Sequence, residues 1–428
     1  MNPKQEIYWH TTVAMPDASN LVPLPEKVDV AVVGGGFTGL SAARTLAKRG
    51  STVAVLDSNS IGGGASSRNG GMVLTGLKLS METVFHRYGG EAAKRLFQSS
   101  LDGIQLVEEI VRDENIDCGF ARRGHLLTAN KPSHYEGFQA SAEFMERELG
   151  HKQRLIPRSE QHTEIGSDLY YGALVDETSA GLNPAQYVAG LAHAAEKAGA
   201  TLHAYAPLQH VERRPHGFVL ETGRGQLKAD KVLIATSGYT GGATPRLQRK
   251  IIPIGSFIIA TEELPEATVR ELSPNGRMMF DSRHFLNYFR VWGNRLIFGG
   301  RAAFFPESAS TLRSSAGILR GDMVRVYPQL RDAKVEYVWG GTLDFAFDMM
   351  THAGEMDGLY YSLGYAGHGV AMATYLGKTV AEAMLDGSIR DHPFASIPFP
   401  GAPLGLYDGR AWFLPFAGMW QRILDWIE

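Results

Sequence analysis

The sequence has almost no cysteine and little excess of either charge. One cysteine, Cys118, stands in 428 residues, which excludes internal disulfides and cysteine-based zinc sites. The formal net charge is -3, so the composition has no basic excess that would attract nucleic acid. Neither a signal-peptide core nor an apolar run long enough to span a bilayer is present. We therefore expect a soluble, cytoplasmic protein in which Cys118 is a buried hydrophobic residue rather than a nucleophile.

The composition is that of a protein with a large core. Hydrophobic residues make up 44% of the chain, and the length favours two or three domains. The last segment, residues 400–428, is rich in aromatic residues, among them Trp412, Trp420 and Trp426. A helix that packs its apolar face on the protein is the favoured interpretation of this tail. Contact with a membrane surface or a partner is the alternative, disfavoured because the polar face lacks lysines.

Residues 28–57 have the pattern of a strand, a glycine loop, a helix and a second strand. The loop contains Gly34, Gly36 and Gly39 in the spacing G-x-G-x-x-G. In such a loop the first glycine permits a tight turn, the second lets a pyrophosphate approach the backbone, and the third lets the helix pack on the strand. The second strand ends at Asp57, where an acid can bind a ribose hydroxyl. This unit predicts a bound dinucleotide, with the helix N-terminus facing its phosphates.

A second loop of small residues follows directly, over residues 60–73, with the sequence SIGGGASSRNGGMV. A nicotinamide dehydrogenase has no general need for such a loop, whereas the longer FAD molecule continues past the first loop. An ordinary surface turn is the alternative, and the apolar residues that end the segment weaken it. We therefore expect FAD rather than NAD.

Hydrophobic periodicity predicts further elements along the chain. Helices are expected over residues 83–113, 132–149, 183–199, 309–326 and 370–385. A hairpin is expected around residues 292–294, because Gly293 and Asn294 suit a tight turn. No internal repeat and no low-complexity linker divides the chain, so we expect its strand-rich blocks to interleave.

In this order the motifs resemble those of the D-amino-acid-oxidase-like flavoproteins, a family that includes glycine oxidase and monomeric sarcosine oxidase. The resemblance rests on DVAVVGGGFTGLSAARTLAKRG, GASSRNGG, VLIATSGYTG, NYFRVWGNRLIFGGR and GYAGHGVAMATYLGK. It looks closest to the γ-glutamylputrescine oxidoreductase branch. It implies an α/β fold in which a Rossmann-like FAD-binding domain is interleaved with an α+β substrate domain that carries a large, mostly antiparallel sheet.

The resemblance also implies domain boundaries and cofactor contacts. The FAD-binding domain is expected to comprise residues 27–85, 150–245 and 327–390, and the substrate domain residues 86–149 and 246–326, with the tail at 400–428. The expected cofactor-binding residues are Gly34, Gly36, Phe37, Thr38, Gly39, Asp57, Ser58, Gly64, Ala65, Ser66, Ser67, Arg68, Asn69, Gly70, Leu208, Thr236, Ser237, Gly238, Gly367, His368, Gly369 and Val370.

The glycine-rich loop around His368 lies more than three hundred residues after the first glycine loop. In the family that the chain resembles, such a loop passes the flavin ring, and the helix after it points its N-terminus at the pyrimidine edge. Gly367 and Gly369 would let the backbone come close, and the helix dipole would favour negative charge there. The alternative for His368 is a core histidine without a role, as for most of the 14 histidines.

The resemblance further implies that FAD is bound non-covalently. Sarcosine oxidases attach the flavin through a cysteine late in the chain, whereas Cys118 lies in the first half. Dimethylglycine-dehydrogenase-like relatives use a histidine in the second loop, where Asn69 stands here.

Amine oxidation in this family passes a hydride from the α-carbon of a neutral amine to the flavin, and water hydrolyses the resulting imine. Such chemistry needs neither a metal nor a nucleophile. Tyr288 and Arg290 share one face of a strand by its period of two, and both resemble cavity-facing positions, as does Trp339. Arg290 could hold a carboxylate or lie on an exposed face, and Trp339 could border the ring or belong to the core. Together with His368, these are the expected catalytic residues.

The substrate is expected to be larger than a simple amino acid. Where glycine-oxidase-like members have an arginine after the tryptophan, Leu343 stands here, followed by Asp344 and Asp348. A secondary amine or polyamine derivative such as γ-glutamylputrescine is therefore favoured, with oxygen or another electron acceptor. Oxidation of an N-substituted glycine, such as sarcosine or iminodiacetate, is the alternative within enzymes. A flavoprotein that carries electrons to a membrane acceptor is the alternative of another class.

Overall fold

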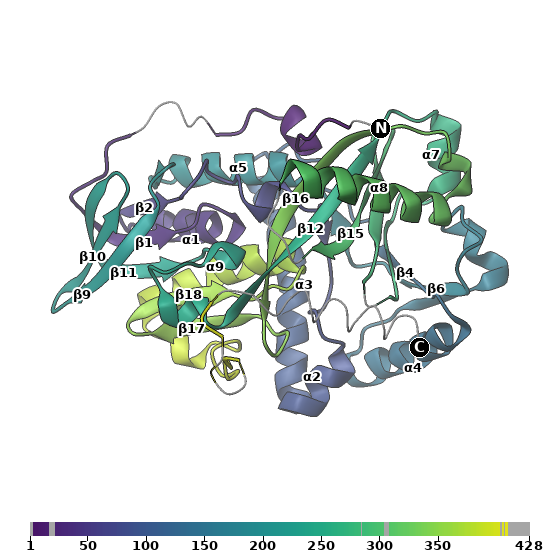
Figure 1. The fold of residues 1–428 in the computed structure, drawn as a ribbon. Helices are drawn as coiled ribbons and strands as arrows, with labels where there is room; N and C mark the ends of the chain where they lie inside the picture. Colours follow the sequence, from purple (N-terminus) through teal and green to yellow (C-terminus); the bar gives the residue numbers. More distant parts are fainter. Residues whose placement is uncertain are drawn as a thin grey trace.

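The computed structural model describes residues 3–16, 22–283, 285–303, 308–402, 405 and 407–409. Over these residues the chain forms two eight-stranded sheets, a two-stranded ribbon and the helices that pack on them (Figure 1). Strands that are far apart in the sequence lie side by side in each large sheet. This confirms the expected fold class, in which an α/β unit is interleaved with a second unit built on a large sheet.

The first sheet is mainly parallel and has the strand order β17-β18-β11-β1-β2-β8, with β10 beside β11 and β9 beside β10. Its strand β1 pairs in parallel with β11 and with β2. Four consecutive residues at the end of β1 are buried, so both of its faces are covered there, and its sequence is accordingly almost continuously apolar. The strands are β1 (Lys27–Val33), β2 (Val53–Leu56), β8 (Thr201–His203), β9 (Leu208–Arg214), β10 (Gly217–Thr222), β11 (Gly225–Ile234), β17 (His352–Met356) and β18 (Leu359–Leu363).

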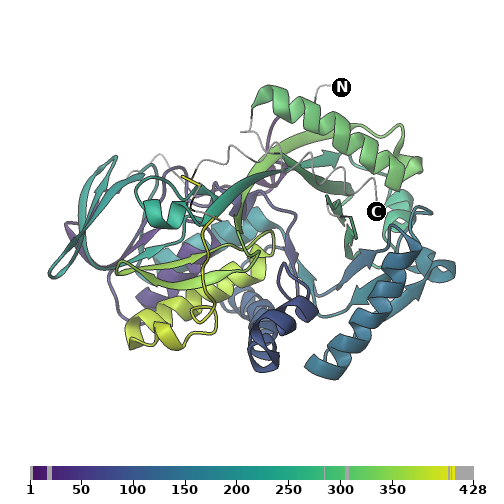
Figure 2. The same ribbon diagram turned by 60° about the horizontal axis from the view of Figure 1, so that its bottom comes forward.

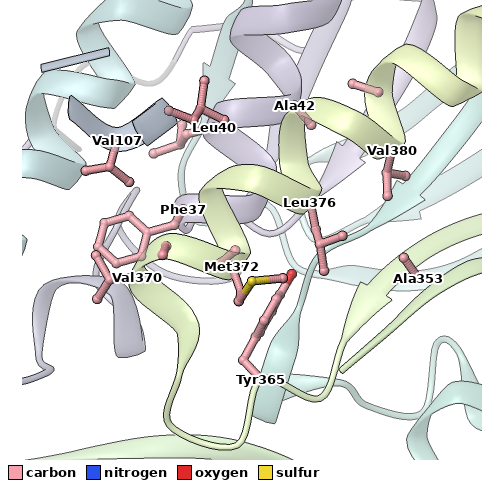
Figure 3. Packing of buried hydrophobic residues seen from close by; sticks show 14 of the residues in the cluster. Phe37, Leu40, Ala42, Val107, Ala353, Tyr365, Val370, Met372, Leu376 and Val380 are labelled. Atoms are coloured by element: carbon pink, nitrogen blue, oxygen red, sulfur yellow. The ribbon is translucent and has the colours of Figure 1, made fainter. Parts of the chain in front are cut away.

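Three helices pack on this sheet and a fourth packs on one of them. The three are α1 (Phe37–Lys48), α5 (Pro184–Lys197) and α9 (Gly369–Asp386), and α3 (Gly90–Asp113) packs on α9. Small residues set how closely they approach, because a Cβ added at Gly377 would lie 2.3 Å from the carbonyl oxygen of Thr38. Figure 3 shows the apolar side chains of this core, among them Phe37, Val107 and Met372.

The second sheet has the order β16-β12-β15-β14-β13-β4-β6-β5, and its neighbouring strands are antiparallel except β13 and β4. Helix α8 packs on β12, β15 and β16. Helices α2 and α4 lie on the other side of the second sheet from α8 (Figures 1 and 2). The strands are β4 (His125–Thr128), β5 (Arg154–Pro157), β6 (Gly172–Asp176), β12 (Ile251–Thr261), β13 (Met278–Asp281), β14 (Tyr288–Trp292), β15 (Arg295–Ala303) and β16 (Val335–Ala346). The helices are α2 (Met81–Tyr88), α4 (Pro132–Leu149), α7 (Glu266–Leu272) and α8 (Ala309–Val326).

Short elements complete the described chain. The ribbon pairs β3 (Met72–Val73) with β7 (Ala180–Gly181). A short α-helix and six 3₁₀ turns connect the longer elements: α6 (Pro245–Gln248), η1 (Tyr8–Thr11), η2 (Ala65–Ser67), η3 (Arg158–Thr163), η4 (Ser237–Tyr239), η5 (Pro328–Leu330) and η6 (Ile389–Asp391). The helices that the structure describes include none long and apolar enough to cross a membrane.

Most of the helices expected from the sequence are confirmed. The two expected over 132–149 and 309–326 are α4 and α8, and those expected over 183–199 and 370–385 are α5 and α9. The helical structure expected over 83–113 is confirmed as two helices, α2 and α3, which are divided at Gly89 with a φ of +83°. The expected hairpin is confirmed as β14 and β15, joined through Gly293 at a φ of +54°.

The expected domain boundaries do not follow the two sheets. Strands β5 and β6 lie within the segment 150–245 and β16 lies within 327–390, yet all three belong to the second sheet. Helix α3 lies within 86–149 but packs on α9. Periodicity identifies a strand but not its neighbours, so the sequence could not assign these segments. Most of the expected tail, residues 410–428, lies outside the described residues.

Candidate functional site

A cavity of about 1050 Å³ lies between the two sheets. Its walls include the N-terminus of α1, the second glycine loop, the inner face of the second sheet and the loop that leads into α9. The volume is at the upper end of the range for small-molecule sites in proteins. Segments separated by more than three hundred residues therefore border one space.

The first glycine loop is packed so closely that side chains are excluded from it. Gly34 has a φ of +112°, and a Cβ added there would lie 2.4 Å from the carbonyl oxygen of Ala235. A Cβ at Gly39 would lie 1.8 Å from the carbonyl oxygen of Gly34. Helix α1 begins at Phe37 and its N-cap, Gly36, makes no side-chain cap. The N–H of Phe37 donates to the Oγ of Ser66 at 3.0 Å. Because the first N–H groups of a helix have no partner within it, the rest of this first turn offers donors and a positive dipole to the cavity.

Asp57 follows β2 and lines the cavity. Its Oδ2 accepts a hydrogen bond from the N–H of Gly35 at 2.7 Å, and its Oδ1 accepts one from the N–H of Asn59 at 2.8 Å. Burial raises the pKa of this carboxyl, and the two N–H groups oppose that shift. Each oxygen keeps a further lone pair, so Asp57 can still accept hydrogen bonds from hydroxyl groups of a ligand.

The second glycine loop is held from behind by two tryptophans. The indole Nε1 of Trp339 donates to the carbonyl oxygen of Arg68 at 2.8 Å, and that of Trp9 donates to the carbonyl oxygen of Asn69 at 2.9 Å. Both indoles are buried, and neither lines the cavity. The prediction that Trp339 borders the reaction site is therefore not supported by its position.

Arg290 binds the same loop at Gly71, which follows the residues that the two tryptophans bind. Its Nη1 donates to the carbonyl oxygens of Gly71 at 2.9 Å and Leu182 at 3.1 Å, and its guanidinium stacks on Trp292. Burial, followed by the nearby charge of Arg123, lowers the pKa of Arg290 to about 10. Arg290 does not line the cavity, so its position does not support the expected role of a substrate clamp.

These contacts turn the N–H groups of the second loop toward the cavity. The described chain has no cis peptide bond, and in a trans peptide the N–H points away from the C=O. The carbonyls of Arg68 and Asn69 point at the tryptophans, so the N–H groups of Asn69 and Gly70 point the other way. Both residues line the cavity. The loop therefore adds a row of backbone donors opposite its supports.

The loop before α9 is anchored by Asp344. The carboxylate of Asp344 accepts hydrogen bonds from the N–H groups of Gly364 at 2.6 Å and Tyr365 at 3.2 Å. Burial raises the pKa of Asp344 to about 6, against the effect of these N–H groups. Gly367 follows with a φ of +91°, and α9 begins at Gly369. A second helix N-terminus thus opens on the cavity.

His368 and Tyr288 are the two expected catalytic residues that line the cavity. Burial, with the charges of Lys78 and His125, lowers the pKa of His368 to about 3, so its imidazole is neutral near pH 7. The Tyr288 hydroxyl lies 3.0 Å from the Oγ of Ser256, and burial raises its pKa to about 12. Both side chains can therefore form neutral hydrogen bonds.

Most of the residues expected to contact the cofactor line this cavity. They are Gly34, Gly36, Phe37, Thr38, Asp57, Ser58, Gly64, Ala65, Ser66, Arg68, Asn69, Gly70, Leu208, Thr236, Ser237, Gly367, His368, Gly369 and Val370. Gly39, Ser67 and Gly238 do not line it. Gly39 packs on Gly34, Ser67 bonds to His10 at 2.8 Å, and a Cβ at Gly238 would lie 2.7 Å from the carbonyl oxygen of Leu343.

Three functional candidates were missed in the sequence. Trp9 carries no local motif, because its contact with the second loop exists only in the fold. His125 and Lys78 line the cavity, yet a lone histidine and a lone lysine give no pattern to find. Among the residues that the structure describes, no group of three or more His, Cys, Asp or Glu side chains could hold a metal ion.

Comparison with known proteins connects this site to a family. Residues 29–383 match the family model DAO, described as FAD dependent oxidoreductase. The chain is 31% identical over 398 residues to γ-glutamylputrescine oxidoreductase of Escherichia coli, which covers 91% of this chain and 90% of that protein. It is 31% identical over 393 residues to the probable oxidoreductase OrdL of Haemophilus influenzae, with 90% and 88% covered.

Solved structures show the same fold. Glycine oxidase from Geobacillus kaustophilus matches with a TM-score of 0.74 and 22% identity, over 88% of this chain and 100% of that one.

Proposed function

Because the chain belongs to the DAO family of FAD-dependent oxidoreductases, we propose that it binds FAD non-covalently and oxidises a secondary amine or polyamine derivative, such as γ-glutamylputrescine. Within this family the chain is of the amine and amino-acid oxidase type. One observation carries the proposal: two helix N-termini and a loop of backbone donors open on the same cavity.

The residues present fit FAD. The N-terminus of α1 would face the pyrophosphate, and Asp57 would accept hydrogen bonds from ribose hydroxyls. The donors of residues 69–70 and the N-terminus of α9 would contact the flavin, where both favour negative charge. The glycines at positions 34 and 39 are required by packing alone.

FAD, when bound, supplies the chemistry of hydride acceptance from an amine. The chain's own residues position the substrate and exclude water. The neutral imidazole of His368 can accept a hydrogen bond from an amine N–H and so orient the amine in the cavity. The apolar side chains of Leu127, Leu174 and Phe280 line the part of the cavity under the second sheet, where they keep the reacting region dry.

Two positions support non-covalent binding. Cys118 is fully buried in the core of the first unit and does not line the cavity. The side chain of Asn69 is occupied by the carbonyl oxygens of Ala65 and Ser66 and by the N–H of Gly71. Neither offers a nucleophile to a flavin.

Spectroscopy of the purified protein tests this proposal. We expect a flavin spectrum, release of free FAD on acid precipitation, and anaerobic bleaching by secondary amines or polyamine derivatives. A pellet that retains the flavin would contradict non-covalent binding. A flavin that no amine in a panel bleaches would contradict the amine substrate. Hydrogen peroxide release, compared with reduction of a quinone dye, then identifies the electron acceptor.

A further inference from the structure

Among the residues that the structure describes, the ammonium group of Lys78 lines the cavity without a counter-charge. Lys78 lies in the segment between β3 and α2, and residues 74–82, from this segment into the first turn of α2, line the cavity continuously. Its side chain is half-buried, and it forms no hydrogen bond or ion pair with the residues that the structure describes. Burial lowers the pKa of Lys78.

The other charged side chains of the cavity are already engaged. Arg68 donates to the carbonyl oxygens of Gly63 and Gly340. Asp57 and Asp344 accept from backbone N–H groups as described above, and Glu82 accepts from the Oγ of Ser141 at 2.6 Å. Lys78 therefore differs from every other cavity-lining cation or anion among the described residues.

An unpaired ammonium in a half-buried site is unfavourable unless a ligand supplies the anion. Lys78 and His368 line the same cavity, and the charge of Lys78 contributes to the lowered pKa of His368. At position 343, on the inner face of the second sheet, the cavity wall is a leucine. The cavity therefore has the cation of Lys78 on the wall formed by residues 74–82 and the apolar side chain of Leu343 on the wall formed by the second sheet.

We propose that Lys78 is the specificity-determining residue of the substrate site and that it pairs with a carboxylate carried by the amine substrate. The substrate class is therefore an amine that also bears an anionic group. That anionic group binds Lys78, in the wall formed by residues 74–82, and not a residue of β16. This inference rests on the proposed amine-oxidising function.

Binding and kinetics of four proteins test the role of Lys78: the FAD-loaded wild type, K78M, K78R and the control K334M. Lys334 is exposed, lies outside the cavity and has no side-chain partner among the described residues, so K334M should behave as wild type. The probe for equilibrium binding is glutarate, which cannot be oxidised as an amine, measured by calorimetry. The kinetic probes are 4-(methylamino)butanoate and N-methylbutylamine, which share the reacting group and differ in the carboxylate.

We expect K78M to bind glutarate about 10- to 100-fold more weakly than the wild type, since a hydrogen bond to a charged group is lost. K78R should recover part of this affinity. The KM for 4-(methylamino)butanoate should rise in K78M, and its kcat/KM should fall about 10- to 100-fold more than that for N-methylbutylamine.

Three results would overturn the assignment of Lys78. They are equal glutarate affinity in wild type and K78M, absence of glutarate binding to the wild type, and loss of FAD from K78M, which would make Lys78 a counter-ion of the cofactor. If neither amine bleaches the flavin, the amine-oxidising function fails, and glutarate binding still reports on Lys78 separately.

Discussion

Arg290 illustrates how a side chain can serve a site without entering it. Its guanidinium is buried behind the second glycine loop and donates to carbonyl oxygens of Gly71 and Leu182. Trp339 and Trp9 do the same for two earlier carbonyls. A hydrogen bond from a charged donor contributes about 1.5–3 kcal/mol, so Arg290 is expected to be the strongest of the three supports.

Replacing Arg290 by methionine should therefore weaken FAD binding at least about tenfold, because the loop carbonyls lose their donor and the loop loses its shape. The KM for the amine, measured at saturating FAD, should change little. Titration of the apoprotein with FAD and steady-state kinetics separate the two effects. Unchanged FAD affinity with a raised KM would instead restore the role of a substrate clamp.

At the scale of elements, strand β16 and helix α9 are joined through Asp344. Its carboxyl binds the two N–H groups that begin the loop before α9, and its own carbonyl oxygen accepts from the N–H of Ala366 at 2.9 Å. The position of the second helix N-terminus therefore depends on a side chain of the second sheet.

The stability of the apoprotein should record the titration of Asp344. The pKa of Asp344 in the folded protein is raised to about 6 from an ordinary value of 3.8. The contribution of the protonated carboxyl to the unfolding free energy is therefore present in full below about pH 4 and is lost as the pH rises through 6. The difference in unfolding free energy between wild type and D344N should shrink by about 3 kcal/mol from pH 4 to pH 7. Urea denaturation of the two FAD-free proteins measures it. A difference that is constant with pH would contradict the buried titration.

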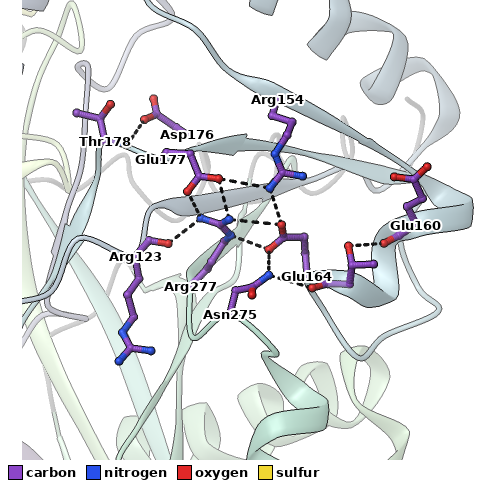
Figure 4. A network of polar contacts seen from close by, with 10 residues as sticks. Arg123, Arg154, Glu160, Glu164, Asp176, Glu177, Thr178, Asn275 and Arg277 are labelled. Atoms are coloured by element: carbon purple, nitrogen blue, oxygen red, sulfur yellow. Dashed lines mark hydrogen bonds and ion pairs between the residues drawn. The ribbon is translucent and has the colours of Figure 1, made fainter.

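A second junction, between β5, β6 and the start of β13, is ionic (Figure 4). Arg277 bonds to Glu164 and to Glu177, each at 2.6 Å, and Arg154 bonds to both acids as well. Glu164 is almost fully buried, with 3% of its side chain exposed. Removing Arg277 leaves the buried Glu164 with only the half-exposed Arg154 as a charged partner.

We therefore expect R277M to lower the unfolding free energy by up to about 3–5 kcal/mol, with Arg154 retaining part of the compensation of Glu164. The matched control is R270M, which removes the exposed pair of Arg270 and Glu266, with 67% and 71% of the side chains exposed, and should cost about 1 kcal/mol or less. Urea denaturation compares the two variants. Equal losses would show that burial of Glu164 does not matter to stability.

At the scale of the whole molecule, local patterns predicted more than long-range ones. The loop from Gly34 to Gly39, the acid Asp57 and helix α8 are determined by neighbours in sequence, and all lie where expected. The period of two correctly placed Tyr288 and Arg290 on one face of β14, toward the second loop. This period could not reveal that the side chain of Tyr288 lines the cavity, whereas that of Arg290 binds the back of the second glycine loop.

What the sequence could not supply depends on contacts between distant segments. Trp9 supports the second loop from the N-terminal segment, and Lys78 is notable only because it has no hydrogen-bond or ion-pair partner among the described residues. The membership of β5 and β6 in the second sheet could not be predicted, because the pattern of a strand does not identify its neighbours. The fold class needed no such contacts, since the βαβ unit and the order of motifs already implied it.

The central claim is that two glycine-rich segments, one before α1 and one before α9, border a single FAD site. Titration of the apoprotein with FAD, followed by calorimetry or flavin fluorescence, tests this claim most directly. The account predicts one FAD per chain, with G39V abolishing uptake because a Cβ there would lie 1.8 Å from the carbonyl oxygen of Gly34. Absence of FAD binding by the wild-type protein, or a G39V protein that is folded and takes up FAD normally, would contradict it.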